Sequence, residues 1–178
     1  MLNNRVKIPH FNEKVQISER ANVRETADVM RQIIEIESKK PYILNLAREL
    51  SISLNEPYKS AFVLSNFAFN AATFEPDTNG IQVIKTPAAT LRTKRGNCVD
   101  YTVLIGAIAN ALRIPVIIKV VAIGEGENFG HVYPIVNGLP CDVVPYQRQD
   151  GTEHLHRQKE TVVYPIEKEY NKYFIVEI

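Results

Sequence analysis

Three side chains that can cooperate in nucleophilic chemistry occur in the order Cys98, His131 and Asp142. A cysteine attacks as its thiolate, a histidine moves protons to and from the reacting groups, and a carboxylate fixes the orientation of the imidazole. These three residues are therefore our candidate catalytic residues. They can act together only if the secondary-structure elements around them bring them together.

The sequence around Cys98 predicts the start of a buried helix. Asn97 can cap a strongly apolar helix that runs from Cys98 to about Leu112, and the preceding Gly96 would let a substrate backbone approach closely. The unpaired amides and the positive end of the helix dipole favour a thiolate at this position. By itself, however, a lone cysteine is more often a small buried apolar residue.

A β-hairpin is predicted around the dipeptide Asn137-Gly138, the strongest short hairpin signal in a sequence. A two-residue turn there pairs Tyr133 with Asp142, so that His131 and Asp142 lie on one face of the hairpin as diagonal neighbours. Their backbones would be about 7–8 Å apart, a gap that the two side chains can close. The alternatives are a histidine at a strand end and a carboxylate on an edge strand, neither with a catalytic role.

The remaining pattern predicts an α+β fold in which N-terminal helices and the nucleophile helix pack on an antiparallel β-sheet. We expect an arm over residues 1–22 and one domain over residues 23–178. The expected helices cover residues 23–39, a second helix from 41 to about 50, 57 to about 74, 87–91 and 98–112. The expected strands cover residues 81–84, 116–123, 131–136, 139–144, 161–164 and 173–178.

Several motifs in residues 81–146 resemble the transglutaminase-like superfamily of papain-fold enzymes. The nucleophile motif is Gly96-Asn97-Cys98-Val99-Asp100, and its apolar helix ends at Arg113-Ile114-Pro115. The histidine motif is His131-Val132-Tyr133, and the aspartate motif is Asp142-Val143-Val144-Pro145. The chain differs from the family pattern at Arg113, where glycine is usual, and in having no tryptophan.

The resemblance implies a cysteine peptidase, amidase or acyltransferase that acts on an amide bond of a protein or peptide through a thioester. Cys98 would be the nucleophile, His131 the proton donor and Asp142 its orienting group, with the Cys98 amide as one oxyanion donor. No cofactor or metal is implied. Asp100 would cap the helix or form a salt bridge near the site.

Two alternatives to an enzyme remain open. The first is a structural or adaptor protein, for example a component of a phage virion, that docks through residues 1–22 or through the tail after Tyr146. The second is a module that binds a small molecule or glycan in the same cleft. Faster alkylation of the active-site thiol than of Cys141 would favour the enzyme.

Composition limits which partners and which cellular compartment we expect for the protein. The net charge of +1 gives no reason to expect nucleic acid, and no apolar run approaches the roughly 20 residues that span a membrane. The N-terminus lacks the apolar core of a signal peptide, and only two cysteines occur. We therefore expect a reducing compartment, either a cytoplasm or a phage particle assembled in a bacterial cytoplasm.

Two further groups of residues have a simpler interpretation. The basic residues Arg92, Lys94 and Arg95 beside the nucleophile predict a solvated loop. His154 and His156 have no standard metal-ligand spacing and predict a polar loop.

Overall fold

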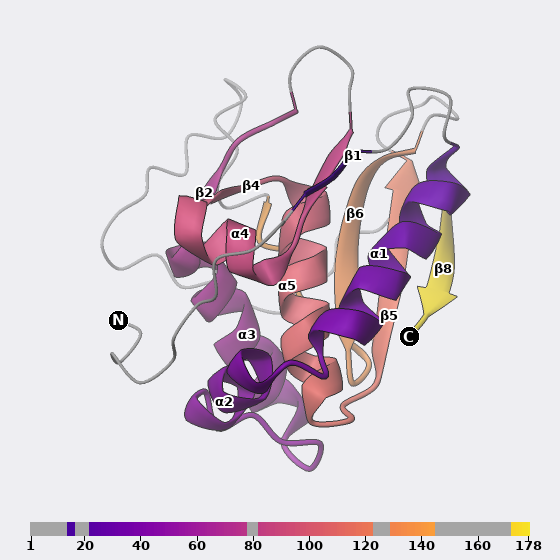
Figure 1. The fold of residues 1–178 in the computed structure, drawn as a ribbon. Helices are drawn as coiled ribbons and strands as arrows, with labels where there is room; N and C mark the ends of the chain where they lie inside the picture. The colour runs from indigo at the N-terminus through magenta and orange to yellow at the C-terminus, as the bar shows by residue number, and fades with distance from the viewer. Residues whose placement is uncertain (1–13, 17–21, 78–81, 123–128, 145–171) are drawn as a thin grey trace.

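The computed structural model describes residues 14–16, 22–77, 82–122, 129–144 and 172–178 (Figure 1). The helices are α1 (Val23–Glu37), α2 (Pro41–Glu49), α3 (Pro57–Ala71), α4 (Pro87–Thr93) and α5 (Cys98–Ala111). The strands are β1 (Lys14–Gln16), β2 (Thr73–Phe74), β3 (Val83–Lys85), β4 (Arg95–Gly96), β5 (Val116–Ala122), β6 (Phe129–Val136), β7 (Leu139–Pro140) and β8 (Tyr173–Glu177).

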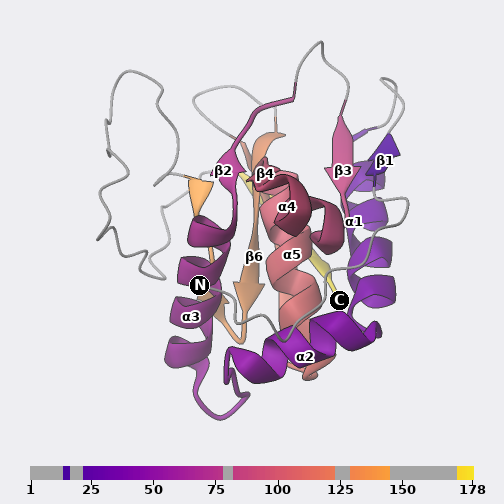
Figure 2. The ribbon, with the colours of Figure 1, turned by 60° about the vertical axis from the view of Figure 1, so that its left-hand side comes forward.

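The central helix of the fold is α5, which is apolar on every side and almost wholly buried. In Figure 2, α1 and α3 lie on either side of α5, while α2 crosses near its C-terminal end. A helix that is apolar all round requires neighbours on every face, and these helices and the sheet supply them. The predicted buried helix at Cys98 is therefore confirmed, and it lies at the centre of the fold.

The principal β-sheet has four antiparallel strands in the order β7-β6-β5-β8. β5 is an inner strand, which fits its run of β-branched residues. β6 and β7 form the predicted hairpin, in which Val136 pairs with Leu139 and Ile135 with Pro140. Asn137 and Gly138 both have positive φ, at 51° and 82°, as the predicted two-residue turn requires.

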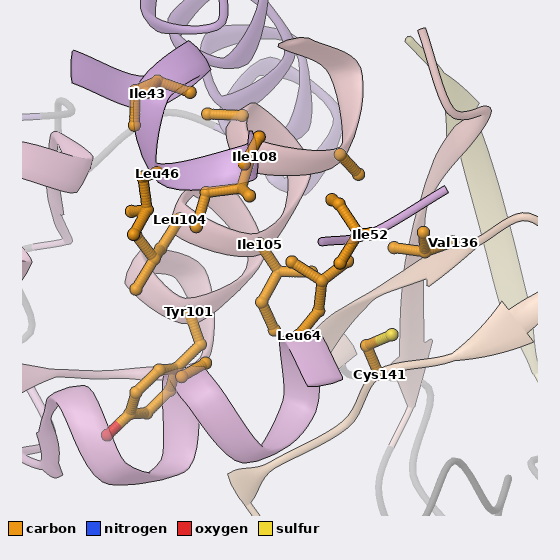
Figure 3. Packing of buried hydrophobic residues seen from close by; sticks show 14 of the residues in the cluster. Ile43, Leu46, Ile52, Leu64, Tyr101, Leu104, Ile105, Ile108, Val136 and Cys141 are labelled. Atoms are coloured by element: carbon orange, nitrogen blue, oxygen red, sulfur yellow. The ribbon is translucent and has the colours of Figure 1, made fainter. Parts of the chain in front are cut away.

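Two apolar clusters meet on α5 and hold the layers together. One cluster joins α5 to α2, α3 and the hairpin, and Figure 3 shows Leu64, Leu104, Ile105, Val136 and Cys141 within it. The other joins α5 to α1 and to the inner face of β5 and β6. Because both clusters include the start of α5, Cys98 is held at the junction of helices and sheet.

Several predicted element ends differ from the structure. The second hairpin strand ends at Pro140 rather than at residue 144, since Asp142 accepts a hydrogen bond from the Val144 amide at 3.2 Å and turns the chain. The third helix ends at Ala71, and β2 after it pairs in parallel with β4 in the segment predicted as a loop. Tyr58, in the first turn of α3, is 57% exposed.

The N-terminal segment and the tail are described only in part. β1 lies within the predicted arm and pairs with β3. The predicted last strand is confirmed as β8. The predicted strand over residues 161–164 and the loop with His154 and His156 lie outside the described residues.

Candidate active site

Cys98 is the first residue of α5, in a turn fixed by a capping box. The Asn97 side chain accepts hydrogen bonds from the Val99 and Asp100 amides at 3.0 and 3.1 Å. The Asp100 carboxylate accepts one from the Asn97 amide at 3.1 Å. Among the residues that the structure describes, no acceptor binds the Cys98 amide, as is usual in the first turn of a helix.

His131 and Asp142 are joined by a short hydrogen bond, in which His131 Nε2 lies 2.7 Å from Asp142 Oδ2. Both side chains are nearly inaccessible to solvent, at 6% and 9% exposed. The structure therefore brings together the two residues that the hairpin register predicts to share a face. Asp142 reaches His131 from the turn after β7 rather than from within a strand.

The contacts of His131 set its charge. Burial lowers the pKa of His131, but the hydrogen bonds to Asp142 and Cys98 and the charges of both groups raise it more, to about 9. Because Asp142 occupies Nε2, Nδ1 is the ring nitrogen available to the Cys98 thiol. The site thus links thiol, imidazole and carboxylate in one chain of contacts.

A β-bulge lies immediately before His131. The pairing of β5 with β6 shifts here, because Val121 lies opposite His131 whereas Ala122 lies opposite Phe129. Gly130 is thus the extra residue on β6. A bulge bends its strand and changes the direction of neighbouring side chains. Because this bulge comes before His131, the regular alternation from His131 to Tyr133 is kept.

Sequence patterns missed a second group of side chains behind the nucleophile turn, which we define as residues 96–98 with the candidate nucleophile Cys98. Lys85 of β3 contacts Asp100 twice, with its backbone amide 2.7 Å from Oδ1 and its ammonium nitrogen 3.0 Å from Oδ2. Asp77 accepts a hydrogen bond from the Asn97 side chain at 2.9 Å. The predicted capping or salt-bridging role of Asp100 is confirmed, whereas its partner Lys85 has no signal in the sequence.

Gly96 is needed for packing within the chain. A Cβ atom at this position would lie 3.1 Å from Asp100 Cβ and 3.3 Å from Thr90 Cγ2, closer than ordinary contacts. The close approach that glycine permits here is thus to Asp100 and α4, whereas the sequence suggested an approach by substrate.

The other candidate residues lie apart from this chain of contacts. Cys141 is buried beneath the hairpin, and burial raises the pKa of its thiol to about 12. Arg95 forms an exposed ion pair with Glu75 at 2.7 Å. Within the described ranges, no three His, Cys, Asp or Glu side chains gather as metal ligands would. None of the helices described is both long and apolar enough to cross a membrane.

Comparison with known protein families gives one match. The sequence model of the transglutaminase-like domain family matches residues 15–137, which include Cys98 and His131 and stop short of Asp142. The chain therefore belongs to the transglutaminase-like domain family, and its mixed helices and antiparallel sheet agree with the α+β fold expected from the resemblance. No curated protein and no solved structure matched the chain.

Proposed function

We propose that the protein is a thiol enzyme that cleaves or transfers amide bonds through a thioester, with Cys98 as nucleophile, His131 as acid and base, and Asp142 as the group that orients His131. The observation that carries the proposal is the chain of contacts from Cys98 to the His131–Asp142 pair. Membership of the transglutaminase-like family supports the same chemistry.

In the first step, the Cys98 thiolate attacks the carbonyl carbon of the substrate amide and forms the carbon–sulfur bond. The carbonyl oxygen becomes an oxyanion, and the Cys98 amide can donate a hydrogen bond to it. The His131 imidazolium then donates its Nδ1 proton to the departing nitrogen, the carbon–nitrogen bond breaks, and an amine leaves. The product of this step is a thioester on Cys98 and a neutral imidazole.

In the second step, His131 removes a proton from water or from a second amine as that molecule attacks the thioester. The carbon–sulfur bond breaks, and Cys98 leaves as a thiolate beside a renewed imidazolium. Water gives a carboxylic acid, and an amine gives a new amide. Asp142 stays ionised throughout and stabilises the imidazolium. The substrate class proposed is a protein or peptide with an accessible amide group.

Alkylation with iodoacetamide tests this function without a known substrate. We expect Cys98 to react at neutral pH at least ten times faster than Cys141, because burial keeps the Cys141 thiol protonated. Peptide mass spectrometry measures the two rates in one sample. His131→Ala should slow the reaction of Cys98 and leave Cys141 unchanged.

Val143→Ala, a substitution beside the site that keeps all three side chains, is the matched control for loss of packing. Equal and slow reaction of both thiols in the folded protein would contradict the proposed enzyme and favour a structural or adaptor role.

A further inference from the structure

Outside the three proposed catalytic residues, a buried ion pair between Lys85 and Asp100 lies behind the nucleophile turn. The Asp100 side chain is 0% exposed and that of Lys85 is 12% exposed. Asp100 accepts hydrogen bonds from the Asn97 amide, the Lys85 amide and the Lys85 ammonium group. This one carboxylate therefore ties the turn that precedes Cys98 to strand β3.

Such a carboxylate has two opposing effects on a nucleophile. It stabilises the helix start by capping and by interaction with the helix dipole. It also places a buried negative charge two residues from a sulfur that must become negative, and like charges disfavour each other strongly at low dielectric. The charged groups near this turn in the described residues are His131 from β6, Asp142 after β7, Lys85 from β3, the Arg95–Glu75 pair beside β4, and Asp77 after β2.

Of these groups, Lys85 is the one that touches Asp100. His131 and Asp142 contact each other, Asp77 contacts the Asn97 side chain, and the Arg95–Glu75 pair is exposed. The Lys85 ammonium group is held at 3.0 Å from Asp100 Oδ2 and is largely shielded from water, so its charge is screened far less than that of a surface lysine.

We propose that Lys85 is a positioning residue for the nucleophile: its ammonium group supplies the counter-charge that lets buried Asp100 fix the turn before Cys98 without opposing a thiolate there. This inference rests on the proposed function, since it assigns a task to the surroundings of the same cysteine. It concerns the charge balance of the site and involves no contact between Lys85 and substrate.

The test compares full-length variants that remove first the charge of Asp100 and then the charges of both residues. Asp100→Asn leaves Lys85 as an unbalanced cation, Lys85→Met/Asp100→Asn removes both charges, and Lys85→Arg/Asp100→Asn keeps the cation with another side chain. The readout is the acid limb of the pH profile for alkylation of Cys98 by iodoacetamide, where the rate rises as thiolate forms. Circular dichroism at each pH confirms that the variants are folded.

We expect the acid limb of Asp100→Asn to lie about one pH unit below that of Lys85→Met/Asp100→Asn, because a poorly screened cation near the turn favours the thiolate. Lys85→Arg/Asp100→Asn should match Asp100→Asn. The wild type should match the variant without either charge, because its pair is balanced. A merely structural pair would instead move the acid limb of all three variants together.

Coincident acid limbs in Asp100→Asn and Lys85→Met/Asp100→Asn would overturn the proposal, as would a wild type that matches Asp100→Asn. If the Asp100→Asn variants do not fold, the same three side chains at position 85 are compared in an Asp100→Ser background, whose hydroxyl can still accept from Asn97. The proposed function fails separately, if wild-type Cys98 reacts no faster than Cys141 at neutral pH.

Discussion

At the residue scale, the proposed chemistry depends on which partner each ring nitrogen of His131 contacts. Nε2 is committed to Asp142 at 2.7 Å, and the ring is packed beside Tyr133 with a centroid separation of 5.7 Å. A buried imidazole would ordinarily be neutral, because burial disfavours its charged form. The hydrogen bonds and charge interactions with Asp142 and Cys98 outweigh burial and give the ring a pKa of about 9.

The first prediction concerns the charge of His131 when its carboxylate partner is neutralised. In Asp142→Asn the ring loses its charged acceptor while burial still lowers its pKa, so the midpoint should fall from about 9 by more than one pH unit. Titration of protein labelled with ¹⁵N-histidine, followed by NMR, measures it directly. The His131 signal is assigned by its absence in His131→Gln.

Asp77→Asn is the matched control for this titration, because it neutralises a carboxylate that contacts the nucleophile turn without touching His131. It should leave the His131 midpoint within a few tenths of a unit. A midpoint that stays near 9 in Asp142→Asn would show that Asp142 does not set the charge of this ring.

At the element scale, helix α5 ends in a Schellman motif, and the residue at its left-handed position is Arg113, where the family pattern has glycine. The Ile114 amide donates to the Ala109 carbonyl at 3.2 Å and the Arg113 amide to the Asn110 carbonyl at 2.9 Å. Arg113 therefore has a left-handed conformation with φ of 58°. Glycine, usual at this position in related sequences, adopts that conformation without the steric cost that arginine carries.

The second prediction follows from this conformation. Arg113→Gly should raise the free energy of unfolding by about 0.5–1 kcal/mol, because removal of the side chain relieves the left-handed strain by more than the added chain entropy costs. Urea unfolding followed by circular dichroism measures the change. Arg113→Ala keeps a Cβ atom and the strain and should give little or no gain, so equal gains in both variants would contradict the explanation.

The third prediction concerns the packing of α1 on α5 at Gly106. A Cβ atom at this glycine would lie 2.7 Å from Ile34 Cδ1 and 3.2 Å from Ile34 Cγ1. We expect Gly106→Ala to lower the free energy of unfolding by about 1 kcal/mol, because crowding in the core outweighs the better helix propensity of alanine.

Ile34→Val supplies the matched partner, since it removes the Cδ1 atom that makes the closest contact. In the double variant Gly106→Ala/Ile34→Val, the loss should be smaller than the sum of the two single losses by about 0.5 kcal/mol or more. Strict additivity, measured by urea unfolding of all four proteins, would show that the two positions do not meet.

The hairpin and helix α5 also show which parts of the fold could be predicted from the sequence alone. The Asn137-Gly138 turn and the start of α5 were predictable because short-range signals set both: positive φ in the turn and a capping side chain before the helix. The end of the hairpin was not, because the Asp142 side chain competes for backbone donors and ends the strand early.

The candidate site was likewise predictable from the sequence only in part. The contact between His131 and Asp142 followed from the hairpin register and is confirmed, although Asp142 lies just beyond the strand. The catalytic role of the three residues stays a prediction. The contact of Lys85 with Asp100 joins residues fifteen positions apart on different elements. No periodic pattern in a single sequence marks such a pair, since only the packing of β3 on α5 creates it.

At the scale of the whole molecule, the proposed site depends on both apolar clusters at once. α5 carries Cys98 between α1 on one side and α3 on the other, and the sheet carries His131 against the same helix (Figure 2). Charge within the site is thus coupled to folding, because the pKa of His131 is raised only when helix and hairpin are packed together.

The fourth prediction is a pH dependence of stability that originates in His131. In the folded chain the pKa of His131 is about 9, against about 6.5 when unfolded. Below pH 6.5 both states bind the proton and the full stabilisation is present; as the pH rises towards 9 the unfolded state is deprotonated first, and the stabilisation is lost.

Cys98→Ser removes the thiol that contacts the His131 ring while leaving Asp142 to raise the pKa of the ring. We therefore compare Cys98→Ser with Cys98→Ser/His131→Gln by urea unfolding from pH 5.5 to 9.5, so that the other titrating groups, Cys141 among them, cancel in the difference. The free energy of unfolding of Cys98→Ser, relative to the double variant, should fall by about 1–3 kcal/mol across this range, the equivalent of one to two pKa units. Parallel stability curves would mean that the His131–Asp142 pair does not hold a proton in the folded protein.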